Sequence, residues 1–179
     1  MVEALKTRRS IRNFDPNYEL TKEELDTIVE CALNSPSALN LQENDLIIIR
    51  NKELIQKIDN TVFSKLDNFF QERFLTRQKR YGVTNPVTYD CSALIMIVKN
   101  ERSKEGYVQL DSGILAMSIL TAAQAVGLGS VPIGVLVRPD VEEIIGVEKG
   151  SLCLAIAIGK PKKIEVDPKE VLRKVKYID

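Results

Sequence analysis

The sequence contains no histidine and no tryptophan, and its 25 Lys and Arg residues balance 25 Asp and Glu residues. Without histidine, the chain cannot form a zinc site of the His type or a Ser-His or Cys-His nucleophile pair. The zero net charge argues against a general nucleic-acid binder, because such domains normally carry a basic excess. If the chain is an enzyme, we expect its difficult chemistry to come from an organic cofactor.

Other absences concern metals, phosphate loops and membranes. The three cysteines form no C-x-x-C pair, and neither common glycine-rich phosphate loop is present. No run approaches the roughly 20 apolar residues of a transmembrane helix, and the N-terminus has no apolar signal region. Each cysteine stands in an apolar run, which is typical of reduced thiols in a protein core. We therefore expect a cytoplasmic protein with no membrane or nucleic-acid partner.

Apolar patterning predicts helices that alternate with strands. The expected helices are 2–7, 21–35, 51–59, 114–126 and 138–146. Continuous apolar runs predict buried strands at 45–50, 93–98, 131–137 and 152–159. This alternation indicates one layered helix-sheet-helix domain over residues 1–179.

Four local features refine this prediction. Thr21 and Glu24 form a capping box at a helix start, and Asn51 is expected to cap the next helix. The segment 61–88 is interpreted as a helical cap followed by a mobile loop, and 160–179 as a charged C-terminal tail. The helix from Ile114 is apolar nearly all round, which predicts burial in a core or against another subunit.

The stretch LKTRRSIRNF, at residues 5–14, places three arginines around one serine. In an extended chain, Arg8, Ser10 and Arg12 point to one side because side chains alternate. Arginine binds phosphate through two parallel hydrogen bonds and keeps its charge, so this arrangement suits an anionic ligand. A solvated basic arm is the competing interpretation of these residues.

Two further stretches carry polar or small residues where a ligand could lie. NSPSALNLQ (34–42) gathers hydroxyls and amides in a loop after a helix, a composition suited to a cofactor pocket. AVGLGSVPIG (125–134) contains glycines that would let the backbone approach a flat ligand. Alone, the first is also an ordinary loop and the second an ordinary helix end.

Taken together, RRSIRNF, NSPSALNLQ and AVGLGSVPIG resemble motifs of the FMN-dependent nitroreductase family, and YDCSALIMI, IIGV and AIGKP are weaker matches in the same order. The resemblance covers essentially the whole chain. It implies an α+β, nitroreductase-like three-layer fold, with a central mixed sheet flanked by helices. It also implies an intertwined homodimer with FMN at the interface, in which the apolar helix packs against its copy.

The resemblance assigns cofactor-binding residues in four groups. The group matched to the FMN phosphate, the ribityl chain and the N1–O2 edge of the ring is Arg8, Arg9, Ser10 and Arg12. The group matched to positions from the second subunit is Pro36, Ser37, Asn40 and Gln42. The group matched to a strand start beside the ring is Pro132, Ile133 and Gly134. The candidates for a C-terminal phosphate contact are Lys162, Lys163, Arg173 and Lys174, of which Arg173 is preferred.

The implied reaction is a ping-pong exchange, in which NAD(P)H gives hydride to FMN and an electron-poor acceptor then takes the electrons. The acceptor would be a small molecule such as a nitroaromatic or a quinone. No side-chain acid or base is required, so no catalytic residue is assigned. Arg12 would stabilise the reduced flavin, because hydride arriving at N5 leaves negative charge at N1 and O2.

Because the sequence departs from the family motifs at several positions, the resemblance does not assign the residues of the substrate pocket. Glu43 and Asn44 stand where many members have Pro-Trp, and Pro132 stands where some have an aromatic residue. Four aromatic residues either roof the ring or belong to the core: Phe69, Phe70, Phe74 and Tyr81. The alternatives are a same-fold flavin enzyme with other chemistry (dehalogenation, flavin cleavage, azoline oxidation), a non-catalytic flavin-binding protein, or a basic-armed interaction module.

Overall fold

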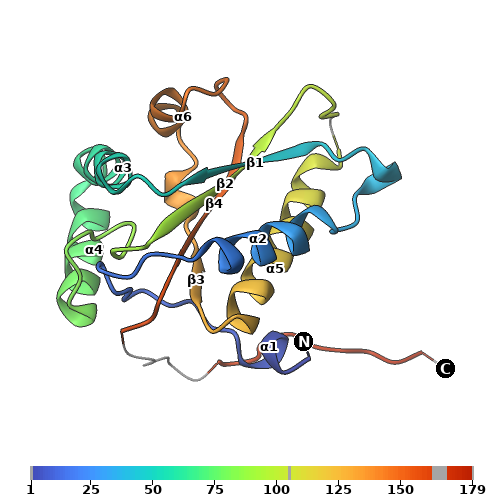
Figure 1. Ribbon diagram of the computed structural model, residues 1–179, viewed down its shortest axis with the longest axis horizontal. Coiled ribbons are helices and arrows are strands. Elements are labelled where there is room, and N and C mark those ends of the chain that lie inside the picture. Colours follow the sequence, from blue (N-terminus) through green and yellow to red (C-terminus); the bar gives the residue numbers. More distant parts are fainter. Residues whose placement is uncertain (1, 105, 163–168, 179) are drawn as a thin grey trace.

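The computed structural model describes residues 2–104, 106–162 and 169–178. Four strands form one sheet: β1 (Asn44–Ile49), β2 (Ala93–Lys99), β3 (Gly129–Pro132) and β4 (Leu152–Gly159). Their order across the sheet is β1-β2-β4-β3, and each neighbouring pair is antiparallel (Figure 1). The parallel part of the predicted mixed sheet is reduced to an isolated bridge between Ser10 and Ser130.

Helices cover both faces of this sheet, which confirms the predicted three-layer α+β arrangement (Figure 1). On one face, α2 (Lys22–Leu33) packs against α5 (Val108–Ala125), and the short α1 (Val2–Thr7) contacts α5. The other face is covered by α3 (Lys52–Ser64), α4 (Asn68–Tyr81) and α6 (Pro139–Ile145). Among these described helices, none combines the length and hydropathy that crossing a bilayer requires.

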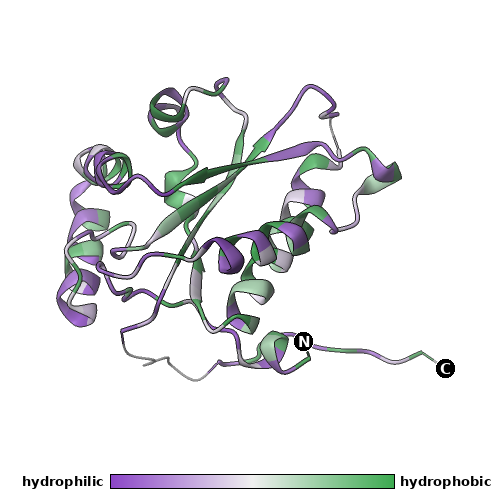
Figure 2. Ribbon diagram, in the orientation of Figure 1, coloured by the Kyte–Doolittle hydropathy of each residue, from purple (hydrophilic) through white to green (hydrophobic). Residues whose placement is uncertain are grey.

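The side chains of β2 alternate between two cores. Leu94, Met96 and Val98 join the core beneath α3, α4 and α6. The alternate residues, Ala93, Ile95 and Ile97, join the core beneath α2 and α5. In Figure 2 the strands β2 and β4 are largely green, whereas α4 is largely purple. A strand with helices on both faces is apolar throughout, and this is why the continuous apolar run predicted β2 correctly.

The two predicted helix caps, at Thr21 and Asn51, are confirmed. The hydroxyl of Thr21 accepts the Glu24 N–H at 3.1 Å, and the Glu24 carboxylate accepts the Thr21 N–H at 2.9 Å. The Asn51 side chain accepts the Leu54 N–H at 2.8 Å. Helix lengths are less well predicted, because α3 continues to residue 64 and α5 begins at residue 108.

The strand expected over residues 131–137 is too long. It ends at Pro132, and residues 134–136 form a short 3-10 turn. The Leu136 N–H donates to the Ile133 carbonyl at 3.2 Å, and the Val137 N–H donates to the Gly134 carbonyl at 3.0 Å. These turn bonds replace the strand ladder after Ile133, so the chain leaves the sheet although its valines favour a strand.

The loop expected to be mobile within 61–88 is buried and firmly bonded at its end. Asp59 of α3 accepts the N–H groups of Val87 and Thr88, at 3.0 and 2.6 Å. Asp90 accepts the N–H of Thr84 at 2.9 Å. Burial raises the pKa of Asp59, although the backbone hydrogen bonds from Thr88 and Val87 act in the opposite direction. The Asp59 carboxylate, which lies on a different element, thus ties the end of this segment to α3.

Two further sequence expectations have clear outcomes. Cys91 is buried, but Cys31 is exposed on α2, so the cysteines are not all core thiols. Glu43, which departs from the common family motif, is fully buried, and its carboxylate accepts the Lys104 N–H. Its backbone carbonyl accepts the Ser103 hydroxyl at 2.6 Å. Glu43 therefore anchors the turn that follows β2.

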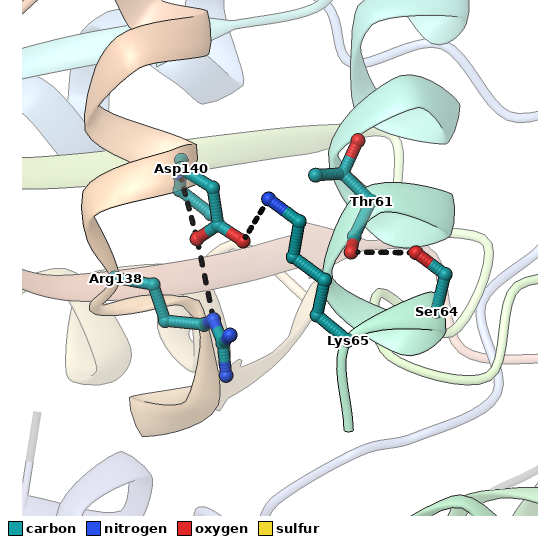
Figure 3. Close-up of polar contacts among 6 residues, drawn as sticks. Thr61, Ser64, Lys65, Arg138 and Asp140 are labelled. Carbon is teal, nitrogen blue, oxygen red and sulfur yellow. Dashed lines mark hydrogen bonds and ion pairs between the residues drawn. The ribbon is translucent and has the colours of Figure 1, made fainter. Parts of the chain in front are cut away.

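An ion-paired group joins the end of α3 to α6 (Figure 3). Lys65 Nζ lies 3.2 Å from one carboxylate oxygen of Asp140, and Arg138 Nε lies 3.2 Å from the other. Burial acts to raise the pKa of Asp140, but hydrogen bonds from Lys65 and Arg138 outweigh it and lower the pKa below its usual range. The pairing holds the start of α6 against the end of α3.

Candidate functional site

Residues 8–14 run as an extended segment along the β3 edge of the sheet, as the sequence predicts. The Ile11 N–H donates to the Ser130 carbonyl at 3.1 Å, and the Phe14 N–H donates to the Tyr89 carbonyl at 3.2 Å. A Cβ added to Gly129 would lie 2.9 Å from the Cβ of Ile11. The glycine thus allows this segment, rather than a ligand, to approach the sheet closely.

Side chains alternate along the segment. Ile11 is buried in the core, whereas Ser10 and Arg12 on either side of it remain partly exposed. One nitrogen of Arg12, Nη1, lies 3.4 Å from the Ser10 carbonyl, to which it donates. The segment therefore turns polar groups outward at the positions where the sequence predicts them.

Arg8 and Arg9 carry positive charge that no ion pair among the described residues neutralises. Arg8 Nε is buried and has no hydrogen-bond partner within the same part of the chain. Arg9 donates to the carbonyls of Lys6 and Arg8, at 3.0 and 2.9 Å. Burial lowers the pKa of Arg8, and the charge of Arg9 lowers it further. A partly buried guanidinium with a free donor favours an anionic ligand over a solvated arm.

A cavity of about 270 Å³ opens where this segment, the end of β3 and α4 meet. Its lining residues are Arg12, Phe70, Arg73, Phe74, Arg77, Tyr89 and Val131–Val135. The structure thus brings Arg12 together with Pro132, Ile133 and Gly134, although they are far apart in the sequence. Tyr89 holds a left-handed backbone (φ 59°), a strained conformation that is more common at functional sites.

Helix α4 supplies one wall of the cavity, and the predicted aromatic residues divide between core and cavity. Phe74 is buried in the core and also lines the cavity, whereas Phe70 is 42% exposed and lines it from the solvent side. Tyr81 packs against the core, and Phe69 is 70% exposed outside the cavity. The sequence interpretation missed Arg73 and Arg77, which share a face with Phe70 and Phe74 by their three- and four-residue spacing.

The second predicted group lies elsewhere in the protomer. Pro36, Ser37 and Gln42 line a separate hollow of about 50 Å³ against α5, and Asn40 is exposed in the same loop. The Asp111 carboxylate of α5 holds this loop by accepting the Ala38 N–H at 3.0 Å. In Figure 1 the loop lies at the opposite end of the molecule from α4. One protomer alone therefore does not bring the two groups together.

The same loop has an unusual backbone. Leu39, Asn40 and Gln42 adopt positive φ angles of 52°, 55° and 52°. Non-glycine residues in this region cost free energy, so the surrounding bonds must hold the loop in shape. One of these bonds runs from the Gln42 N–H to the Ser37 hydroxyl at 3.0 Å.

The C-terminal candidates are not gathered at the cavity. The Lys162 N–H donates to the Asn13 carbonyl at 2.9 Å, and Lys163 lies outside the described residues. Arg173 and Lys174 are exposed in an irregular stretch, 169–178, and among the described polar contacts none joins Arg173 to Arg8. The role of Arg173 stays a prediction.

Known proteins resemble this chain over most of its length. The FMN reductase [NAD(P)H] of Bacillus subtilis is 28% identical over 145 residues, which cover 81% of this chain and 57% of that protein. The NADPH-flavin oxidoreductase of Vibrio harveyi is 30% identical over 177 residues, which cover 94% of this chain and 69% of that protein.

Comparison with solved structures identifies proteins that share this fold. A nitroreductase with bound FMN from Desulfitobacterium hafniense aligns with a TM-score of 0.81 at 21% identity, over 99% of this chain and 97% of that one. The model of the nitroreductase family matches residues 5–160. This match includes the arginine segment, the 34–42 loop and the end of β3. The chain belongs to the nitroreductase family.

Proposed function

We propose that the protein is an FMN-dependent oxidoreductase that takes hydride from NAD(P)H and passes electrons to an electron-poor acceptor. The observation that carries this proposal is the cavity shared by Arg12 and Pro132–Gly134. The Vibrio harveyi relative is named an NADPH-flavin oxidoreductase, the Bacillus subtilis relative an FMN reductase [NAD(P)H], and the Desulfitobacterium hafniense structure contains FMN. These names and the cavity support the same cofactor.

The residues present fit FMN chemically. The unpartnered Nε of Arg8 and the adjacent charge of Arg9 suit a phosphate, and the Ser10 hydroxyl suits a polyol chain. The backbone of residues 132–134, which lines the cavity, suits the edge of a flat ring. Arg8, Arg9 and Ser10 would hold the phosphate end, and Arg12 would lie at the ring.

The contribution of the chain to the reaction is electrostatic and geometric. When bound, FMN supplies the hydride-accepting and electron-donating chemistry. Arg12 places a fixed positive charge in a partly enclosed cavity, where it stabilises negative charge more strongly than in water. Phe70, Phe74 and Tyr89 limit access of water to the same space.

We infer that the working unit is an intertwined homodimer, in which the 34–42 loop of one protomer completes the cavity of its partner. Large apolar side chains are exposed along α2, the loop and α5: Leu33, Leu39, Leu110 and Met117. The stretch 169–178 extends away from the sheet and exposes Val171, Leu172, Val175, Tyr177 and Ile178 (Figure 1). Exposed apolar surface of this extent supports a protein interface.

The test is the visible spectrum of the purified protein, followed by anaerobic addition of NADH or NADPH. We expect absorption bands of oxidised flavin, release of FMN on denaturation, and bleaching by at least one nicotinamide. A protein that is colourless and does not take up added FMN would refute the cofactor. A flavoprotein that neither nicotinamide reduces would refute the reaction and leave the cofactor standing.

A further inference from the structure

The geometry points to a binding site for an anionic group of the substrate, formed by Arg73 and Arg77 on the α4 wall of the cavity. This inference rests on the proposed function, because it assigns the second ligand of the same site. The substrate class is a planar molecule with a carboxylate or phosphate. The anionic group is either on the electron acceptor or on the nicotinamide dinucleotide.

The charge of the cavity is unbalanced. Arg12, Arg73 and Arg77 all line it, and of the described residues that line it none is acidic. Neither Arg73 nor Arg77 takes part in the ion pairs found among the described residues. By contrast, Arg138 is paired with Asp140. Three like charges around one space repel one another until an anion enters, which favours anionic ligands.

Arg77 is held in place on the cavity wall. Its guanidinium carbon lies 5.7 Å from the ring centroid of Phe74, within the range of a cation–π contact. Phe74 is only 6% exposed and belongs to the core, so it gives Arg77 a fixed support. Arg73 lies one helical turn earlier on the same face and is more exposed. The pair thus combines one positioned guanidinium with one adaptable guanidinium.

The arrangement also selects for a flat ligand. Phe70 lies three residues before Arg73 on the cavity face of α4 and leaves part of its ring exposed. An aromatic ring can pack against Phe70 while a carboxylate or phosphate reaches the guanidiniums.

The phosphate of the cofactor has other partners available. Arg8 and Arg9 lie on the N-terminal segment and do not line this cavity, whereas Arg73 and Arg77 lie on α4. The charges on α4 are therefore surplus to the expected cofactor contacts. This surplus is the reason to assign them to the substrate.

The test compares charged and neutral probes of one shape. Calorimetric titration of the holoprotein with 4-nitrobenzoate and with 4-nitrobenzamide gives affinities that do not depend on turnover, and steady-state KM values are measured in parallel. NADP+ and NAD+, which carry the same phosphates but cannot reduce the bound flavin, are compared in the same way. The variants are R73Q, R77Q and the double variant. The matched control is K79Q, which removes an exposed charge from the same helix outside the cavity.

We expect the double variant to weaken 4-nitrobenzoate binding on the order of tenfold, because partly exposed ion pairs are individually weak. In the double variant, the affinity for 4-nitrobenzamide and the content of bound FMN should stay within about twofold of wild type. The affinities of the K79Q control should also stay within about twofold of wild type. A loss confined to the nicotinamides, with 4-nitrobenzoate unaffected, would equally support the anion site and place the anionic group on the dinucleotide.

Two outcomes would overturn the inference. Unchanged affinity of the double variant for 4-nitrobenzoate and for both nicotinamide dinucleotides would show that α4 binds no anion. Loss of FMN from the double variant would assign these arginines to the cofactor instead. If the wild-type protein bound 4-nitrobenzoate in preference to the amide but held no flavin, the proposed function would fail and the anion site would stand.

Discussion

At the scale of single residues, Arg8 has unfavourable surroundings unless an anion binds beside it. Its Nε is buried without a partner among the described residues, and Arg9 adds like charge. An unpaired buried donor costs about 1–3 kcal/mol of folding free energy. Because this donor has no partner in the described part of the protomer, nothing there offsets the cost. The residue is best explained by the anion it would bind.

Replacing Arg8 should therefore weaken FMN binding without destabilising the apoprotein. In R8Q, we expect the free energy of unfolding of the apoprotein to stay unchanged or to rise by up to about 1 kcal/mol. FMN affinity should fall at least tenfold, since hydrogen bonds to charged groups contribute about 1.5–3 kcal/mol. Urea unfolding of the apoprotein and fluorescence titration with FMN measure the two quantities.

The exposed Lys6 provides the control, because K6Q removes a nearby charge that is solvated. It should leave both quantities close to wild type. A large loss of apoprotein stability in R8Q would show instead that Arg8 has a structural role. Unchanged FMN affinity would remove it from the cofactor site.

At the scale of elements, the Lys65–Asp140–Arg138 group provides a pH-dependent link between α3 and α6. The folded pKa of Asp140 is lowered, so its ionised form contributes stability above the unfolded pKa of about 4. That contribution is lost as the pH falls through the lower, folded pKa. Stability that depends on Asp140 should therefore be present at neutral pH and absent in acid.

We expect D140N to lower the free energy of unfolding by about 1 kcal/mol at pH 7, since Lys65 and Arg138 are partly exposed. The difference from wild type should shrink as the pH falls below the unfolded pKa of about 4 and disappear once the folded carboxyl is protonated. Urea denaturation at several pH values measures it. D26N, which breaks an exposed pair with Lys22 in α2, should show almost no effect at either pH. A D140N deficit that is the same at all pH values would contradict the electrostatic explanation.

The elements also show what can be predicted from the sequence. The capping box of α2, the Asn51 cap and the apolar run of β2 depend on neighbouring residues, and these predictions are confirmed. The tether from Asp111 to Ala38 joins residues 73 positions apart, and nothing near either residue indicates it. The motifs singled out Arg12, but the cavity role of Arg77 depends on where the fold places α4 relative to the end of β3. Local signals therefore predicted elements, and contacts distant in sequence decided the site.

At the scale of the whole molecule, the candidate cofactor residues divide between two ends of the protomer (Figure 1). A homodimer with composite sites makes a specific prediction for mixed subunits. R12A impairs the cavity end, and N40A impairs the loop end. In a dimer with one copy of each variant, one site contains both defects and the other contains none.

Each variant alone should bind FMN weakly. Mixing them in equal amounts, with partial unfolding and refolding to exchange subunits, should restore about one quarter of the wild-type sites, because half the dimers are mixed and each has one intact site. Flavin content per chain after gel filtration measures the recovery. A mixture that binds no more FMN than the average of its components would place both groups in the same protomer or outside the site.

One feature of α4 has consequences for how this protein could diversify. Within α4 a single side chain, Phe74, is buried, and the helix is bounded by the Asp67 cap and the left-handed Gly82. Substitutions at Phe70, Arg73 or Arg77 would therefore alter the ligand range without disturbing the sheet. Because Phe70, Arg73 and Arg77 lie outside the core, new substrate preferences can arise at these positions at little cost to folding.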